Sequence, residues 1–442
     1  MSRIRKVTVA IVSWNGRKHL EICLEALRAQ HDPGVAWEVA VLDNGSSDGT
    51  VEWLRREHPW VRCVESPANL GFCAGNNRLV AAAEGDAIAL LNNDTRPSPE
   101  WLGALVEALA SAPDDVAAVS GQIVDWSGEK LDFGAGVMTF DGHAFQKDFG
   151  RPLAEARIPA AAEELPFACG GNMLIRRASY EAAGGFDEGY FAYLEDVDLG
   201  WRLWSGGERV IFSPAAQVNH RSMATSDLLG NYNRGFLFER NAFLTAYKNY
   251  EPGLWERVMP AVLWTLLHRT QTILVQNNPG GEQLTFDPYA GLIADTAKPE
   301  SGFVPTPPPS PTLAQKWRGY GPKDFLRRAV RKAVRSVLPG WILDPAPAHL
   351  TQLTDGRTVA QLRAITHLLG HLDQAAERRS EIQARRKRSD REIFERFPLH
   401  VVPTYPGDER LFNSPAFAGW LPAELPVVRC GLGDLMAGAQ AS

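Results

Sequence analysis

The sequence predicts an α/β fold built on an open sheet with helices on both faces, followed by a mainly helical C-terminal region. Two patterns predict it: short β-branched runs alternate with amphipathic stretches through the first third of the chain, and polar clusters follow three of these runs. The composition of the 442 residues is that of a globular protein, with 45% hydrophobic and 22% charged residues. This length suggests two to four domains, and the composition excludes disorder over the whole chain.

The elements of the first third follow one another in the order strand, helix, strand, helix. Apolar runs of strand length occur at residues 7–13, 37–42, 60–64, 87–91 and 116–124. Stretches of helical character lie between them, at residues 20–27, 51–57, 74–83 and from 99 onward. This alternation implies parallel strands joined by helical crossovers, and in such sheets ligands bind beyond the carboxyl ends of the strands.

Polar clusters occur at the expected places. Asp43 to Gly49 follows the second strand, Asn69 to Phe72 follows the third, and Asn92 to Thr95 follows the fourth. Any one such cluster is more often a turn or a helix cap than a functional site. Three clusters on one sheet edge favour a binding site.

The middle of the chain is less regular. Asp125 to Pro166 is rich in Gly, Asp and Ala without clear periodicity, and we expect an insertion or a flexible excursion there. A strand is predicted at Gly170 to Arg176, followed by a helix to Ala183. The densest acidic and aromatic patch of the chain then follows at residues 186–202.

Charge and cysteine content narrow the class of protein. The chain has 46 basic and 52 acidic side chains and a formal net charge of −6, which argues against nucleic acid as the main partner. The 5 cysteines are widely spaced without a C-x-x-C pair, which favours scattered reduced thiols and a reducing compartment.

Neither of the two longest apolar candidates qualifies as a secretory signal or as a membrane-spanning helix. Val7 to Val12 is too short for the apolar part of a secretory signal, and Val258 to Gln276 contains His268 and Arg269. We therefore expect a cytoplasmic protein, with peripheral contact at the inner face of the plasma membrane as a second location.

The C-terminal half offers no motif of known chemistry. Residues 298–312 are proline-rich and predict a semi-rigid linker. Lys323 to Leu338 predicts an amphipathic helix with five basic residues on one face, which either contacts an anionic membrane or is solvated over a packed apolar face. Glu377 to Arg396 predicts a second charged helix, solvated or self-associating, and the remainder to Ser442 is expected to be loop-like.

The residue types at the sheet edge suit the displacement of a sugar from a nucleoside diphosphate. Asp43 can accept a hydrogen bond from a pyrimidine N–H, and Asp94 stands where a carboxylate can bind Mg²⁺ or Mn²⁺. A His ligand such as His220 would favour Mn²⁺. One carboxylate among Glu195, Asp196 and Asp198 can take the proton of the attacking hydroxyl.

Helical geometry separates two of these carboxylates. If Glu195 opens a helix, Asp196 and Asp198 lie about 200° apart around its axis and cannot both face one site. One of them is expected to be a carboxylate that only stabilises the helix N-terminus.

Taken together, the motifs resemble family 2 inverting glycosyltransferases of the GT-A fold, most closely the bacterial rhamnosyltransferase-like branch. The resemblance covers residues 7–250 and is carried by six ordered motifs: V-L-D-N-G-S-S-D-G-T, N-L-G-F-C-A-G-N-N, L-L-N-N-D-T, C-G-G-N-M-L-I-R-R, G-G-F-D-E-G-Y-F-A-Y-L-E-D-V-D-L-G-W-R and V-N-H-R.

The resemblance implies a role for each matching residue. Asp43 would bind the nucleotide base, Asp94 would be the last residue of the metal-binding D-x-D motif, and His220 would complete the metal site. Asp196 would be the catalytic base, with Glu195 beside it. Asn92 stands where the family usually has the first metal aspartate, which leaves one carboxylate fewer. Further nucleotide contacts are expected from Asn15, Asn69, Arg78 and Asn93.

These expectations combine into one main hypothesis, an inverting transferase acting in bacterial cell-wall or polysaccharide synthesis. Its donor would be a UDP- or dTDP-linked sugar, with dTDP-rhamnose as one candidate, and its acceptor a glycan or a lipid-linked sugar. The alternatives are a nucleotidyltransferase and a catalytically silent nucleotide- or sugar-binding scaffold, and a homo-oligomer is open. The expected parts are a catalytic domain at 1–250, a helical extension at 251–297, the linker at 298–312 and a mainly helical region at 313–442.

Overall fold

The computed structural model describes residues 4–221, 231–278 and 355–437. Contacts divide the chain into one unit of residues 1–273 and 360–442 and a second of residues 274–359. The first unit carries the sheet and every predicted site residue. The predicted linker at 298–312 and the basic segment Lys323 to Leu338 lie outside the described residues.

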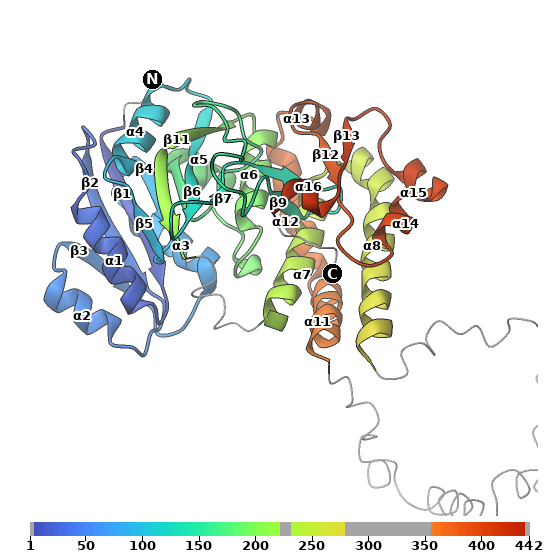
Figure 1. Ribbon diagram of the computed structural model, residues 1–442, viewed down its shortest axis with the longest axis horizontal. Coiled ribbons are helices and arrows are strands. Elements are labelled where there is room, and N and C mark those ends of the chain that lie inside the picture. The colour runs from blue at the N-terminus through green and yellow to red at the C-terminus, as the bar shows by residue number, and fades with distance from the viewer. Residues whose placement is uncertain (1–3, 222–230, 279–354, 438–442) are drawn as a thin grey trace, which may run out of the picture. The chain divides into compact units, whose positions relative to one another are not determined.

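The first unit is built on a sheet of nine strands, which lies among the blue to green elements of Figure 1. Eight strands follow the order β3-β2-β1-β4-β10-β6-β11-β5, and β7 pairs with β6. Their bounds are β1 Lys6–Ser13, β2 Ala36–Asp43, β3 Val61–Glu65, β4 Ala87–Leu91, β5 Thr95–Pro97, β6 Val116–Asp125, β7 Leu131–Phe133, β10 Asn172–Arg176 and β11 Arg209–His220. The strands expected from the sequence are all present.

Strand direction places the functional edge. Strands β1 to β4 are mutually parallel, with Ser13 at the end of β1 opposite Asp43 at the end of β2. Strand β10 is antiparallel to β4, so its first residue, Asn172, pairs with Leu91 at the end of β4. The start of β10 therefore reaches the same edge as the carboxyl ends of the parallel strands.

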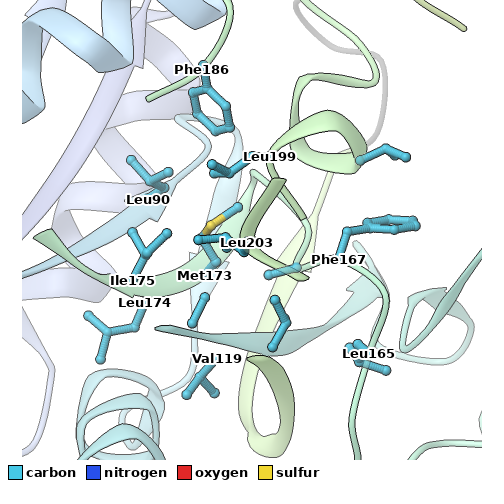
Figure 2. Close-up of a cluster of buried hydrophobic side chains, with 14 of the residues drawn as sticks. Leu90, Val119, Leu165, Phe167, Met173, Leu174, Ile175, Phe186, Leu199 and Leu203 are labelled. Atoms are coloured by element: carbon cyan, nitrogen blue, oxygen red, sulfur yellow. The ribbon is translucent and has the colours of Figure 1, made fainter. Parts of the chain in front are cut away.

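Helices pack on this sheet and close its core. The helices of the first half are α1 Arg17–Arg28, α2 Thr50–Glu57, α3 Gly71–Ala82, α4 Trp101–Ser111, α5 Arg177–Ala183, the short 3₁₀ helix η1 Glu188–Tyr190 and α6 Glu195–Ser205. Helix α3 packs on β1 and β2, and α4 packs on β6 and β11. Figure 2 shows how Met173 and Ile175 of β10 gather with Leu199 and Leu203 of α6 in one buried apolar cluster.

The prediction of a flexible excursion after residue 125 is wrong, because this segment is folded. Besides β7, this segment forms the hairpin of β8 (Gly136–Met138) and β9 (Ala144–Gln146). Phe133, Val137 and Phe140 are buried in it. Its apolar side chains are too widely spaced to show a period, so their burial could not be inferred from the pattern.

The C-terminal part is mainly helical where it is described, as expected. Its elements are α7 Asn231–Asn249, α8 Pro252–Asn277, α11 Gly356–Gly370, α12 Leu372–Arg385, α13 Asp390–Arg396, β12 Leu399–Val401, α14 Asp408–Phe412, α15 Pro415–Trp420, β13 Val427–Arg429 and α16 Leu432–Leu435. The expectation of a loop-like end is therefore wrong. Together with the sheet, these elements confirm the predicted α/β class with a helical C-terminal region.

The charged segment Glu377 to Arg396 is two helices rather than one. Much of it is solvated, as expected, since Glu377, Glu381 and Arg391 are exposed, whereas Asp390 is buried, and self-association stays a prediction. Helix α12 lies beside α7 (Figure 1), and residues 386–389 separate it from α13. Within this link, Arg388 donates hydrogen bonds to the carbonyl oxygens of Trp204 and Glu208, at 2.9 and 3.0 Å. The charge of Arg388 thus serves packing, because buried backbone acceptors need donors.

Asp390 is the buried centre of this contact. Its carboxylate accepts hydrogen bonds from the backbone N–H of Glu251 at 2.7 Å, from Trp201 Nε1 at 3.3 Å and from Arg386 at 3.0 Å. Beside it the rings of Trp201, Tyr250 and Phe394 pack against one another. Residues 386–397 thus pack on α6 and the start of α8, while the division into four domains stays a prediction.

No helix among the described residues is both long and apolar enough to span a bilayer.

We expect Asp390→Ala to destabilise the protein by about 1–3 kcal/mol, because it removes the acceptor that Arg386, Trp201 and the backbone N–H of Glu251 share. Urea unfolding would measure this at a pH well above the pKa of about 6 that burial gives Asp390. Glu395→Ala on the same helix breaks only an exposed pair with Arg391 and is the control. Equal stability of the two variants would contradict the role of Asp390.

Candidate active site

Asp43 lies at the end of β2 with only 3% of its surface exposed. Its Oδ2 accepts a hydrogen bond from the backbone N–H of Ser46 at 3.1 Å. Its Oδ1 is buried and has no hydrogen-bond partner among the described residues. A buried carboxylate oxygen without a donor is costly, so this atom suits the N–H of a bound base.

The other predicted nucleotide contacts fall into two groups. The amide oxygen of Asn15 accepts from the backbone N–H of Ser47 at 2.8 Å, and the amide nitrogen of Asn93 donates to Ser13 Oγ at 3.0 Å. Asn69 caps the start of α3 through the N–H of Gly71 at 2.9 Å. Arg78, on the same helix, is exposed and makes no hydrogen bond or ion pair with the described residues. The first three make contacts at the sheet edge, whereas the role of Arg78 stays a prediction.

The two predicted metal ligands come together. Asp94 follows β4, and His220 ends β11, where it pairs with Thr95. The Nε2 atom of His220 lies 3.3 Å from Asp94 Oδ1. Two ligand atoms bound to one ion at about 2.1 Å in octahedral geometry lie about 3 Å apart, so this spacing fits a shared ion.

Asp132 completes this pair and was missed by the sequence analysis. Strand β7 brings Asp132 Oδ2 to 2.9 Å from His220 Nδ1. Burial alone would lower the pKa of His220, but its hydrogen bonds to Asp132 and Asp94 raise it to about 10. A carboxylate on the second nitrogen is the usual way in which a metal-binding histidine is oriented. No pattern in the sequence around Asp132 indicates this role.

The residues present fit a divalent ion that is shared with a substrate. The described residues contain no group of three or more His, Cys, Asp or Glu side chains placed to hold a metal. Magnesium-type sites commonly use one or two carboxylates and complete the shell with water and substrate phosphates. Asp94 and His220 would therefore hold such an ion only together with oxygen ligands from a bound substrate.

Glu195 and Asp196 occupy the first turn of α6. The Oδ2 atom of Asp196 accepts a hydrogen bond from the backbone N–H of Gly170 at 3.0 Å. Next to Gly170, the carbonyl of Gly171 accepts from the N–H of Asn92 at 3.1 Å. A side chain at Gly171 would collide with Asn92, so this glycine allows the close approach. The glycine pair thus joins the acidic pair to the end of β4.

The pKa values of Glu195 and Asp196 are both raised above their ordinary values. Burial raises the pKa of Asp196, although that residue keeps some exposed surface. Burial and the neighbouring charge of Asp196 raise the pKa of Glu195 well above its usual range. The Oε2 atom of Glu195 is buried without a hydrogen-bond partner among the described residues. Asp196 is therefore the member of the pair that ionises first, and so the one whose carboxylate is available to accept a proton.

Asp198 points into the protein, as helical geometry predicted for one of the two aspartates. It is fully buried, and its carboxylate lies 2.8 Å from Arg202 and 3.1 Å from Lys248. Burial would raise the pKa of Asp198, but the two cations hold it at about 2. It is a structural carboxylate and does not act by the helix dipole alone.

Family comparison agrees with the fold. Residues 8–184 match the family model described as "Glycosyl transferase family 2". The segment of residues 8–184 is therefore that of a family 2 glycosyltransferase, and the curled open sheet is of the GT-A type. The matched segment runs from β1 to the end of α5 and includes Asp43 and Asp94.

Two curated relatives come from Mycobacterium tuberculosis (strain ATCC 25618 / H37Rv). The chain is 29% identical to an N-acetylglucosaminyl-diphospho-decaprenol L-rhamnosyltransferase over 232 residues, 48% of this chain and 75% of that protein. It is 29% identical to a pre-mycofactocin glycosyltransferase over 222 residues, 49% of this chain and 43% of that protein.

Among solved structures, a mannosyltransferase from Pyrobaculum calidifontis in complex with GDP-Man and Mn²⁺ is 17% identical, with a TM-score of 0.41. The match covers 84% of this chain and 88% of that one. At this TM-score the likeness supports no conclusion about ligands.

We expect Asp132→Ala to raise the Mn²⁺ concentration needed for half-maximal turnover by about 10- to 100-fold, because His220 loses its orienting partner. Turnover as a function of Mn²⁺, together with direct Mn²⁺ binding by electron spin resonance, would measure it. Asp115→Asn removes an exposed carboxylate paired with Arg209 and is the control. An unchanged metal requirement in Asp132→Ala, or full activity of the native chain in EDTA, would contradict the site.

Proposed function

We propose that the chain is an inverting glycosyltransferase that moves a sugar from a nucleoside-diphosphate sugar to a hydroxyl of a glycan or lipid-linked acceptor. The observation that carries the proposal is the meeting of three groups at one sheet edge: Asp43 with an unpartnered Oδ1, the pair of Asp94 and His220, and the acidic pair on α6. They correspond to a base contact, a diphosphate-bound ion and a general base.

The proposed chemistry is a single displacement. Asp196 takes the proton of the acceptor hydroxyl while its oxygen attacks the anomeric carbon, and the bond from that carbon to the diphosphate breaks on the opposite side. The products are the inverted glycoside and a nucleoside diphosphate. A divalent ion held by Asp94 and His220 would stabilise the charge on the leaving diphosphate.

Glu195 has a different proposed task. Its raised pKa keeps it protonated over a wider range than Asp196, so it can donate a hydrogen bond where Asp196 accepts a proton. We assign Glu195 to orienting the acceptor. The nucleotidyltransferase alternative lacks support, because the loop from Ser13 to Lys18 would have to bind an α-phosphate with few glycines.

The identity of the donor and acceptor is a finer part of the proposal. One relative is named for L-rhamnosyl transfer and for a diphospho-decaprenol. This supports dTDP-rhamnose among the UDP- and dTDP-linked candidates, and a lipid-linked acceptor. A thermal-shift panel of nucleotide sugars with and without Mn²⁺ or Mg²⁺ would identify the donor, and a silent scaffold would bind without releasing nucleoside diphosphate.

Lys323 to Leu338 stays the proposed membrane contact.

We expect Asp196→Asn to lower kcat by about 100- to 10,000-fold and to leave donor binding nearly unchanged, because a base acts in the transition state. Release of nucleoside diphosphate measures kcat, and calorimetry measures donor affinity. Glu195→Gln, the neighbouring variant, is expected to be milder, since glutamine resembles a protonated glutamate in shape. If Asp196→Asn keeps most of the native rate, Asp196 is not the base.

The pH dependence of kcat follows from the same pair. The base must be ionised, so kcat falls as the pH falls through the pKa of Asp196, which burial raises above 3.8. At saturating Mn²⁺ and donor, we expect the acid limb of the kcat profile above that value. Glu195→Gln should leave the limb in place, because a protonated Glu195 carries no charge to remove. An acid limb at or below 3.8 would contradict this assignment.

A further inference from the structure

The loop that carries the acidic pair has a strained backbone. Between η1 and α6, the φ angles of Phe191, Tyr193 and Leu194 are +64°, +69° and +63°. These are three of the six non-glycine residues with positive φ in the described part of the chain. Such conformations persist only where surrounding contacts hold them, and they concentrate at functional sites.

The side chain of Asn241 on α7 holds this loop through hydrogen bonds to the loop's carbonyl oxygens. The amide nitrogen of Asn241 donates to the carbonyl oxygens of Tyr190, Ala192 and Tyr193, at 3.2, 2.8 and 2.7 Å. Asn241 is completely buried. Because an amide nitrogen has two hydrogens, one of them is shared between acceptors. A single side chain therefore fixes three carbonyls within four residues.

Neighbouring groups fix the amide and the opposite side of the loop. The Nε atom of Arg240 donates to Asn241 Oδ1 at 2.9 Å, and its guanidinium also donates to the carbonyl of Tyr190 at 2.6 Å. From α3, the N–H of Phe72 and of Cys73 donate to the carbonyl of Phe191, at 2.7 and 3.2 Å. The loop is held between α3 and α7.

We propose that Asn241 is a positioning residue for transfer, holding residues 190–194 in the strained form that sets Glu195 and Asp196 in the site. The proposal rests on the proposed function, because the loop matters to turnover through Asp196. Asn241 is too deeply buried to contact substrate, so its effect on the reaction passes through the loop. Ordinary packing of a helix on a loop would not need one amide facing three carbonyls.

The first test is Asn241→Asp, which keeps the shape and replaces the donor by an acceptor facing three carbonyl oxygens. We expect kcat to fall by at least about 10-fold, since a displacement of about 1 Å at the reacting groups can cost about 100-fold. Donor affinity should be nearly unchanged, because Asp43, Asp94 and His220 lie on the sheet. Hydrogen exchange of the amides in residues 191–196 should become faster, while exchange in the strands stays as it was.

A second variant keeps the test informative if Asn241→Asp does not fold. Arg240→Lys keeps the charge but cannot donate to both Asn241 Oδ1 and the carbonyl of Tyr190 from one rigid group. We expect kcat to fall and hydrogen exchange of the amides in residues 191–196 to become faster, both by less than in Asn241→Asp. Thr265→Val is the control, because it removes a buried hydroxyl whose bond stays within α8.

Three results would overturn the proposal: native kcat in Asn241→Asp, faster exchange in the loop without loss of kcat, or a loss of kcat equal to that of Thr265→Val at equal thermal stability. Asp196→Asn is measured alongside. If that variant stays active while Asn241→Asp loses kcat, the base assignment fails and the positioning role stands.

Discussion

The geometry of the site depends on the buried carboxylate of Asp198, which must be paired. A charge this deep in the protein is tolerated only beside opposite charges and donors. Arg202 lies one turn along α6, and Lys248 and Asn249 reach the carboxylate from α7. These contacts fix the rotation of α6 about its axis and its distance from α7. Since Asp196 lies about 200° away around the helix, the same contacts turn it towards Gly170.

Those features of the fold and the site that arise locally could be predicted from the sequence. The period of apolar residues gave the strands, and parallel crossovers place the residues after each strand on one edge. This is why Asp43 and Asp94 could be selected before their positions were known. His220 and the acidic residues could be named as candidates from their chemistry, but their individual roles depended on family resemblance, because nothing near them in sequence indicates that they meet the sheet edge.

The rest could not be predicted because it consists of contacts between distant residues of ordinary local character. Asp132 lies in a segment without periodicity, and only the pairing of β7 with β6 brings it near His220. Asn241 is an unremarkable residue within a helix until three carbonyls converge on it. The positive φ angles of Phe191, Tyr193 and Leu194 contradict the local preference of aromatic and aliphatic side chains. Local rules fail where function requires strain, as expected for a site.

Helix α7 carries two of these constraints, Lys248 towards α6 and Asn241 towards the loop, so its own position matters to the site. The amide nitrogen of Gln383 on α12 donates to the carbonyl oxygens of Lys248, Asn249 and Tyr250, at 2.9, 3.3 and 3.2 Å. These are the carbonyls at the end of α7 that its own helix leaves unpaired. The C-terminal part of the chain therefore caps the helix that holds the acidic pair. We therefore expect a shift of α12 to disturb the end of α7, and through α7 the placement of the acidic pair.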